Sequence, residues 1–546
     1  MAQDKVMNRR QFLNSSLYAS TALLTQNVWK RSALADTPIF ASNSVLNDAN
    51  PIAQIIDPDS KDFTGDAPDF PHEVLWDKWN YLKSQGGIPQ PKKKYPVVIV
   101  GGGIAGLLAA DRVKHQGPLL LEQAPRFGGN SKGEKFQNAE YTIGAAYVTV
   151  PEDGDENDRL YHELDLMPLM KKEDEMSVFL NGVKVQGFWN GETDPERRYQ
   201  FQEVFAKMKE IYENSYPEIP TVDDPENHDL VISLDQMNFF QWLNQNFTEV
   251  HPHILEYFQL YCWSSFGGNI NEVSAAQMLN FVCSETDGVL TLPGGNSKIS
   301  QKLFERLLSS QAQLRHSCLV VDIKMLSDSV QICFLNANKE LETVLAEKCL
   351  FAAPKVMGAK LIDDCPPALQ SALRSIQYRP YIVGNLLLNR RLNFNHDYDL
   401  YSLQGSMPKN PNTLLTSDRG FSDIVISTWG QDGNTVLSLF KPMAFQGAHQ
   451  YLFAPGLHEK MLGSFKMGLQ QHQSSLGLNH HELDQIRLTR WGHAMPVAFT
   501  QMLSSGRLKP LQTGWNDRVI FIGQDTWVNP SFETAHATAL KAVASL

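Results

Sequence analysis

The sequence predicts an α/β protein in which a Rossmann-like nucleotide-binding domain is interleaved with a second, α+β domain. Three observations lead to this prediction. A strand, a glycine motif and a helix follow one another from residue 97, a second apolar run ends in an acid at residue 122, and another strand–helix unit lies at 518–545. The 546 residues are enough for two or three domains.

Composition limits the function classes. Hydrophobic residues make up 42% of the chain, which is enough for a sizeable core. The net charge of −12 argues against nucleic acid as a partner, because phosphate binding needs a basic surface. The six cysteines form no C-x-x-C pair, so no zinc ribbon or attached haem is indicated, no metal is expected, and unpaired thiols are favoured over disulfides.

The first 35 residues have the features of an export signal. Arg9 and Arg10 precede Phe-Leu, as in the twin-arginine signal, and a short apolar run and a small-x-small site at 33–35 follow. We therefore expect the export machinery as a partner and a mature, folded chain in the periplasm. The alternative is an ordinary basic N-terminus before a helix. Residues 36–94, rich in Asp, Pro, Ser and Lys, predict an extension with little regular structure.

The glycine motif begins after the apolar run 97–100, which predicts a strand buried on both faces. Residues 101–106 read G-x-G-x-x-G, and 107–113 predict a helix. In this motif Gly101 permits a tight turn, Gly103 lets the backbone approach a pyrophosphate, and Gly106 lets the helix pack closely.

A second strand, 119–121, ends at Glu122, where a carboxylate is well placed to accept hydrogen bonds from a ribose diol. Within residues 122–132 the acid is followed by an Arg-x-Gly-Gly motif that begins at Arg126, and the segment ends at Lys132. This pattern resembles the extended flavin fingerprint of the family that contains monoamine oxidases, polyamine oxidases and phytoene desaturases. The resemblance implies FAD rather than NAD, with Arg126 and Lys132 offsetting the diphosphate charge. Residues 141–147 resemble the small-residue stretch that this family places beside the flavin ring.

Later segments fit the same resemblance. A Pro-Gly-Gly turn at 293–295 and a helical pattern at 299–308 resemble the return of the chain to the FAD domain. Residues 318–323 and 330–334 predict strands, and 349–354 resemble the strand and turn that lead out of that domain again.

The last segment resembles the end of an FAD domain. An apolar run ends in Gly523-x-Asp525, and the resemblance implies that Asp525 binds the ribityl chain. A helix from Glu533 to about Ser545 would point its N-terminus at the flavin and stabilise negative charge there. The residues predicted to bind the cofactor are Gly101, Gly103, Ile104, Ala105, Gly106, Glu122, Gln123, Arg126, Gly128, Gly129, Asn130, Ser131, Gly144, Ala145, Val321, Gly523, Asp525, Thr534 and Ala535.

The resemblance also implies a discontinuous organisation. The FAD-binding domain is expected from residues 95–150, 289–360 and 505–546. The substrate domain is expected from 151–288, mostly helical, and from 361–504, a sheet with helices.

Substrate residues are harder to assign. Trp263 and Phe266 are more simply core residues. The catalytic candidates are His493, Trp491 and Phe499, because 490–496 matches the part of the family that faces the flavin. The alternatives are core aromatic rings and a histidine bonded for structure.

Three departures weaken an amine oxidase activity while leaving the fold intact. Residues 381–387 lack the lysine that often reaches flavin N5 through water. Ser531, Phe532 and 497–499 replace the paired aromatic cage of monoamine oxidases. No cysteine follows Cys365, so the FAD is expected to be noncovalent.

These observations predict an FAD-dependent oxidoreductase that transfers a hydride from a small substrate to flavin N5, with the cofactor supplying the chemistry. An amine or polyamine is favoured, by similarity to bacterial spermidine dehydrogenase-like proteins, and would need an acidic pocket. Glu533 either contributes to that pocket or caps the last helix. The electron acceptor is left open among oxygen, quinone and a redox protein. The alternatives are a desaturase or isomerase of an apolar substrate and a flavin-binding protein without turnover.

Overall fold

The computed structural model describes residues 48–546, except 56, 59, 174, 215, 217–218, 222–227, 395–396 and 409–418. The described residues belong to one compact unit, Asn47–Leu546. The expected export signal, residues 1–35, and the first part of the extension lie outside the described residues. No helix in the described part combines the length and apolar character needed to cross a membrane.

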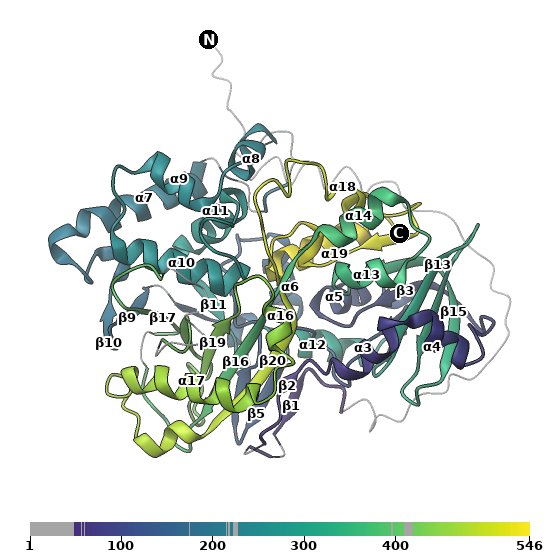
Figure 1. Cartoon of the computed structure of the whole chain (residues 1–546), viewed down its shortest axis with the longest axis horizontal. Coiled ribbons are helices and arrows are strands. Elements are labelled where there is room, and N and C mark those ends of the chain that lie inside the picture. The colour runs from purple at the N-terminus through teal and green to yellow at the C-terminus, as the bar shows by residue number, and fades with distance from the viewer. Residues whose placement is uncertain are drawn as a thin grey trace, which may run out of the picture. The chain divides into compact units, whose positions relative to one another are not determined.

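One mixed sheet carries the glycine motif (Figure 1). Its order is β12-β4-β3-β15-β14-β13, and β21 also pairs with β15. The pairs among β12, β4, β3, β15 and β21 are parallel, whereas β13, β14 and β15 are antiparallel. The strands are β3 (Lys94–Val100), β4 (Leu119–Leu121), β12 (Gln313–Arg315), β13 (Leu319–Met325), β14 (Val330–Leu335), β15 (Leu341–Phe351) and β21 (Val519–Phe521).

The apolar run of β3 divides between two cores, which explains why it does not alternate with polar residues. Val97 and Ile99 pack with α5, α12 and α19 on one face, and Val98 and Val100 belong to the core on the other face. The helices of the first face are α5 (Ile104–Arg112), α12 (Ser297–Leu308) and α19 (Phe532–Val543). The other face carries α13 (Lys355–Leu361) and α14 (Pro367–Ser375).

A second, eight-stranded sheet has the order β10-β9-β17-β18-β19-β16-β20-β2. One face packs on α17 (Leu457–His472), where Phe465 contacts β16, and the other face points towards a cavity. Short helices α16 (Ala448–Tyr451) and α18 (Lys509–Thr513) lie in the connecting segments. The strands are β2 (Thr64–Gly65), β9 (Ser177–Leu180), β10 (Val183–Gln186), β16 (Tyr378–Leu387), β17 (Asp399–Leu403), β18 (Asp423–Ile426), β19 (Val436–Pro442) and β20 (Ile486–Pro496).

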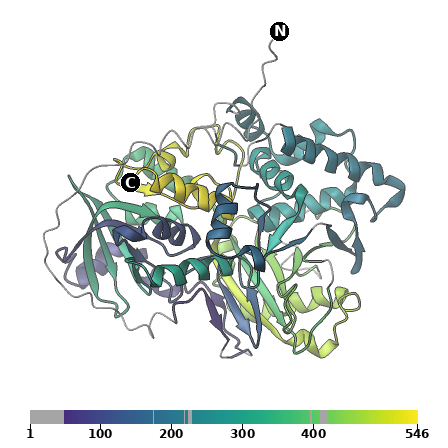
Figure 2. The ribbon, with the colours of Figure 1, turned by 180° about the vertical axis from the view of Figure 1, so that it is seen from behind.

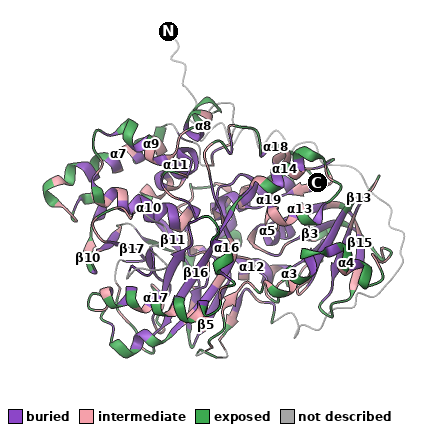
Figure 3. Cartoon of the chain, in the orientation of Figure 1, coloured by how far each residue is buried: buried purple, intermediate pink, exposed green. Residues whose placement is uncertain are grey.

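Most helices of the first substrate segment gather beside this sheet, as Figure 2 shows from behind. The helices of this segment are α6 (Glu156–Glu163), α7 (Arg198–Asn214), α8 (His228–Asp235), α9 (Phe239–Asn246), α10 (Pro252–Phe266) and α11 (Ala275–Ser284). The exception is α6, which packs in the core that also holds α5, α12 and α19. Two small sheets complete the fold. One has β5 (Gly133–Phe136) between β1 (Ile52–Gln54) and β6 (Ala139–Thr142), and the other has β11 (Val289–Thr291) between β7 (Tyr147–Thr149) and β8 (Lys171–Glu173). Buried residues follow the strands of both large sheets (Figure 3).

The prediction of little regular structure in 36–94 is wrong for its described part. That part forms β1, β2, α3 (Asp69–Trp76) and α4 (Lys78–Ser84). The reason is tertiary, because Lys78 is buried and pairs with Asp322 at 3.1 Å and Asp363 at 3.0 Å. The helix after the glycine motif also begins earlier than predicted, at Ile104 rather than 107.

Candidate flavin and substrate site

A cavity of about 650 Å³ lies against both large sheets. Its walls come from the β3–α5 turn, the loop after β4, the start of α19 and the inner face of the eight-stranded sheet. The cavity therefore joins a nucleotide-binding wall to a second wall of different chemistry.

The glycine motif forms the first wall through close backbone contacts. A Cβ added to Gly106 would lie 1.9 Å from the carbonyl oxygen of Gly101, which has a positive φ of 109°. A Cβ added to Gly129 would lie 2.9 Å from Gly103 Cα. Gly103 precedes α5 without a side-chain cap, so the first N–H groups of the helix are available to an anion.

Glu122 is held in place at the edge of this wall. Its two carboxylate oxygens accept hydrogen bonds from the N–H groups of Gly102 and Ala124, each at 2.7 Å. Charge-assisted bonds of this kind fix the carboxylate at the position where a ribose diol would meet it.

Most of the predicted site residues line the cavity. They are Gly101, Gly103, Ile104, Ala105, Glu122, Gln123, Gly129, Asn130, Ser131, Gly144, Ala145, Gly523, Asp525 and Ala535 for the cofactor, with Trp491 and His493. Six others do not lie on its wall: Gly106, Arg126, Gly128, Val321, Thr534 and Phe499.

The reasons for these six differ. Gly106 and Gly128 pack the glycine loop itself, and Thr534 hydrogen-bonds to Ser531 and Asn529. Val321 occupies a bulge in β13 with its side chain in the core, whereas Val320 lines the cavity. Phe499 packs against the large core.

Arg126 does not lie where it was expected to offset the charge of the diphosphate. Its guanidinium donates to the backbone carbonyls of Gly133, at 2.9 Å, and Pro51, at 3.4 Å, outside the cavity wall. Of these two cations of the motif, Lys132 is the one that lines the cavity, with a side chain that is buried and a Nζ 5.7 Å from the Trp491 ring centroid. Burial lowers the pKa of Lys132.

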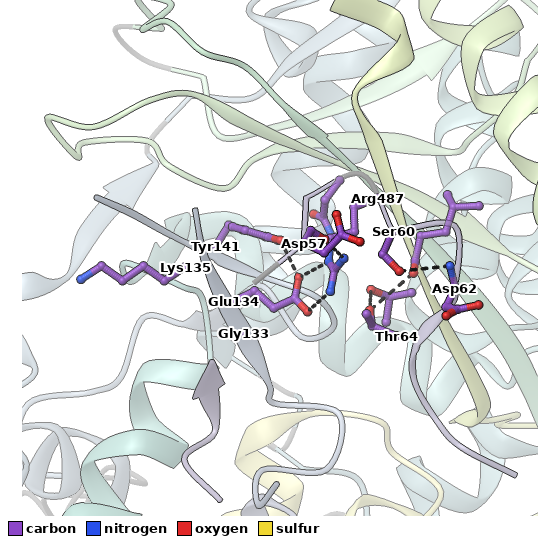
Figure 4. A network of polar contacts seen from close by, with 12 residues as sticks. Asp57, Ser60, Asp62, Thr64, Gly133, Glu134, Lys135, Tyr141 and Arg487 are labelled. Carbon is purple, nitrogen blue, oxygen red and sulfur yellow. Dashed lines mark hydrogen bonds and ion pairs between the residues drawn. The ribbon is translucent and has the colours of Figure 1, made fainter. Parts of the chain in front are cut away.

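A buried ion pair beside this loop joins β5 to β20 (Figure 4). Glu134 accepts from Arg487 Nε at 2.8 Å and from the Tyr141 hydroxyl at 2.5 Å. The indole N–H of Trp491 donates to Ile143 O at 2.7 Å. These contacts fix the small-residue stretch, including Gly144, against the strand that carries Trp491 and His493.

The predicted ribityl-binding acid has a partner that sequence reasoning missed. Lys355, fully buried, donates to Asp525 Oδ1 at 2.5 Å, and the Tyr378 hydroxyl donates to Oδ2 at 2.5 Å. Glu533 does not cap α19, because Ser531 performs that role. The Glu533 carboxylate instead accepts from Thr149 N and Oγ1, both at 2.9 Å, and lines the cavity.

The second wall holds a set of acids that no motif indicated. Glu285, Asp399 and Asp423 line the cavity together with Tyr147 and Tyr401. Asp399 lies on β17 and Asp423 on β18, on the same face of the sheet as Tyr381 and Trp491, and Glu285 follows α11. For Asp399 and Asp423 the sequence signal was a carboxylate at the start of a largely apolar strand, because a buried charge is rarely left without a partner. Glu285 follows a helix and had no such signal.

These acids have no cationic side chain as a partner within the described residues. Glu285 accepts from Tyr261 at 2.7 Å and Tyr147 at 3.2 Å, and Asp399 Oδ1 is buried without a hydrogen bond. Burial raises the pKa of Glu285 to about 7, and burial with the neighbouring Asp423 carboxylate raises the pKa of Asp399 well above its usual range. A cation entering here would relieve this desolvation and repulsion.

His493 lines another part of the cavity, on β20. Its ring is 5.6 Å from the Tyr378 ring and 5.5 Å from the His449 ring, centroid to centroid. Burial lowers the pKa of His493 to about 4, so the imidazole is neutral at neutral pH.

The residues present fit FAD. The uncapped helix N-terminus and close glycine backbones suit a diphosphate, Glu122 suits a ribose, and Asp525 and the start of α19 line the same cavity. When bound, FAD would supply a hydride acceptor at N5.

Comparisons with known proteins agree with this site. A family profile described as an NAD(P)-binding Rossmann-like domain matches residues 99–164. Oxidoreductase PigB of Serratia sp. (strain ATCC 39006) is 24% identical over 411 residues, which are 64% of this chain and 60% of that protein. The probable flavin-containing monoamine oxidase A of Dictyostelium discoideum is 26% identical over 286 residues, 49% of this chain and 59% of that protein. The matches thus span about 60% of the length of these curated relatives.

Solved structures share the fold. Putrescine oxidase bound to putrescine has a TM-score of 0.60 at 16% identity, covering 83% of this chain and 98% of that one. A CLA-producing fatty acid isomerase from P. acnes has a TM-score of 0.57 at 16% identity, covering 82% and 97%.

The fold and site define a flavoprotein with a Rossmann-type nucleotide-binding domain. In sequence this chain is similar to an oxidoreductase and to flavin-containing amine oxidases, and its fold is similar to that of putrescine oxidase.

Proposed function

We propose that this chain is an FAD-dependent oxidoreductase that oxidises an amine or polyamine. The observation that carries the proposal is the acidic wall of Glu285, Asp399 and Asp423, which has no cationic partner of its own among the described residues. An ammonium group is the small-molecule cation that such a wall would recognise.

The strand order of the eight-stranded sheet sets the distance between the acidic wall and Trp491. Asp423 lies on β18, three strands from β20, which carries Trp491, so the two strands are about 14 Å apart. Phe440 and Tyr381 line the cavity on the strands between them. This arrangement suits an extended chain with an ammonium at the acids and an apolar stem along the aromatic rings.

The reaction removes a hydride from the carbon next to a substrate nitrogen. With bound FAD as the hydride acceptor, the substrate would become an iminium, which water hydrolyses to an aldehyde and either ammonia, from a primary amine, or a smaller amine, from a secondary one. The chain's own residues bind and orient the substrate, and the buried Tyr261 and the half-buried Tyr147 cover Glu285 through their hydrogen bonds to it.

The test is an anaerobic titration of the purified flavoprotein with a diamine, a triamine, a monoamine and a diol of the same length as the diamine. We expect the diamine or triamine to bleach the flavin absorbance at the lowest concentration, and the diol to leave it unchanged. Equal bleaching by diol and diamine would contradict the role of the acidic wall.

A second candidate is a desaturase or isomerase of an apolar substrate. The observation that favours it is the aromatic floor formed by Tyr381, Phe440 and Trp491. A long-chain unsaturated fatty acid, added to the same titration, separates the two functions by its product. A flavin that none of these compounds bleaches or transforms would favour a binding protein without turnover.

A further inference from the structure

We propose that a second arm of the cavity, walled by α3, α16 and β20, binds a quinone that accepts the electrons taken from the substrate. The inference rests on the proposed flavin chemistry, and it adds a site for the electron acceptor. Its wall contains His72, Leu452, Phe453, His449 and His493.

The order of the strands separates this arm from the acids. β2 and β20 lie at one end of the eight-stranded sheet, and β18 lies three strands from β20, about 14 Å away. Asp66 directly follows β2, and its Oδ2 accepts from Gly492 N at 2.7 Å. This bond holds the segment leading into α3 against β20, so that α3 forms a wall of the arm.

The arm presents hydrogen-bonding groups without partners. His449 Nε2 is buried and has no hydrogen bond, and Arg490 Nε is in the same condition. The ring centroids of His449 and His493 are 5.5 Å apart. A buried N–H group or ring nitrogen without a hydrogen bond destabilises the folded protein. A ligand that forms a hydrogen bond with it removes this cost, which favours binding.

The outer part of the arm is apolar. Phe453 is 51% exposed, its ring lies 5.5 Å from the His72 ring, and Pro68 and Pro71 line the same wall. A ligand therefore enters past an aromatic and proline surface and meets the histidines deeper in the arm.

The charges of the arm disfavour an ammonium ion. Arg490 and Lys132 both line the cavity here. The carboxylate of Asp66 accepts a hydrogen bond from Gly492 N and lies near these two cations. A neutral, planar ring with two carbonyl oxygens fits the combination of apolar entry and imidazole donors. Dioxygen would need no such lined arm.

A ligand in this arm must accept the two electrons that leave the substrate with the hydride. The quinone would take up the hydride removed from the amine, by way of bound FAD, and one proton from solvent, so that its two carbonyl oxygens become hydroxyls. His72 is exposed, so a proton from solvent can reach the arm at that side chain.

The experiment separates the two half-reactions. The flavin is reduced photochemically without amine and without oxygen, and then mixed with a soluble short-chain benzoquinone while its absorbance is followed. The Kd of the same quinone for the oxidised holoprotein is measured by titration calorimetry. We expect His449→Phe to weaken quinone binding about tenfold and to slow reoxidation similarly, through loss of one hydrogen bond.

A matched control is available in His458→Phe. His458 Nε2 is also buried without a hydrogen bond, and its ring packs on Phe63 at 5.1 Å, but it does not line the cavity. We expect wild-type quinone binding in this variant. Phe453→Ser, at an exposed position, is a second test of the arm and should also weaken quinone binding.

Three results would overturn the inference. One is a quinone Kd that is unchanged in both His449→Phe and Phe453→Ser, and another is a wild-type flavin that reoxidises with air but not with quinone. The third is a weakened amine Kd in His449→Phe with an unchanged quinone Kd, which would make the arm the amine's entrance. If no amine bleaches the flavin, the proposed function fails, and the photoreduced protein still reports on the quinone.

Discussion

The two walls of the cavity are built in opposite ways. The nucleotide-binding wall comes mainly from residues 101–106 and 122–132, and its contacts are made largely by backbone atoms held close by glycine. The acidic wall comes from β17, β18 and the end of α11, and its contacts are made by side chains. A site made of backbone requires a fixed local sequence, whereas a site made of side chains can draw on any segments that the fold brings together.

The largest effect is expected at the nucleotide wall. In Gly106→Val the new side chain would begin 1.9 Å from Gly101 O, so we expect loss of bound FAD and a stability loss of about 3 kcal/mol or more. Flavin content and thermal unfolding measure both. Gly463→Ala, on the exposed side of α17 with no atom within 4 Å, should keep FAD and gain up to about 1 kcal/mol. A valine variant with normal flavin content would show that the close approach is dispensable.

The next effect concerns pH and the acidic wall. The pKa of Glu285 is about 7 in the folded protein, against an ordinary value of 4.5, so the folded state holds a proton that the unfolded state releases in that range. The contribution of Glu285 to the free energy of unfolding should therefore fall by about 3 kcal/mol as pH rises from 4.5 to 7 and then stay constant. Denaturant titrations at several pH values check this. Glu285→Gln should flatten the slope, and an unchanged slope would assign it to other groups.

A smaller effect is expected for substrate binding. Asp423→Asn removes a charge that the ammonium would meet, which is worth about 1.5–3 kcal/mol, so the amine Kd in anaerobic titrations should rise roughly 10–100-fold. FAD affinity should stay the same, because the two walls are separate. Asp432→Asn is the control, since Asp432 is fully exposed. A loss of FAD together with amine binding would show that the walls are coupled.

The smallest effect compares two cations of one motif. Lys132→Gln should weaken FAD binding about fivefold, corresponding to about 1 kcal/mol, because Lys132 lines the cavity. Arg126→Gln should change FAD affinity less, because its guanidinium bonds to Pro51 and Gly133 instead. Equilibrium FAD binding to the apoprotein measures both. A larger loss of FAD affinity in Arg126→Gln than in Lys132→Gln would show that Arg126 offsets the charge of the diphosphate.

Sequence reasoning reached the nucleotide wall because its signals are local. The strand, glycine motif and acid at Glu122 occur within about 30 residues, the usual length of such a unit, and the structure brings them to one cavity. It failed where the outcome depended on distant contacts. The described part of the extension folds into α3 and α4 because buried Lys78 pairs with Asp322 and Asp363, which lie far along the chain.

The sequence by itself determined the α/β class and the nucleotide-binding wall, because apolar periodicity and glycine geometry act over a few residues. The export signal at Arg9 and Arg10 stays a prediction. Only the tertiary structure decided that Arg126 turns from the cavity, that Lys355 holds Asp525, and that Asp399 and Asp423 face the same space as Trp491. The physical reason is that the direction and burial of a charged side chain depend on strand order and register, which join residues far apart in the chain.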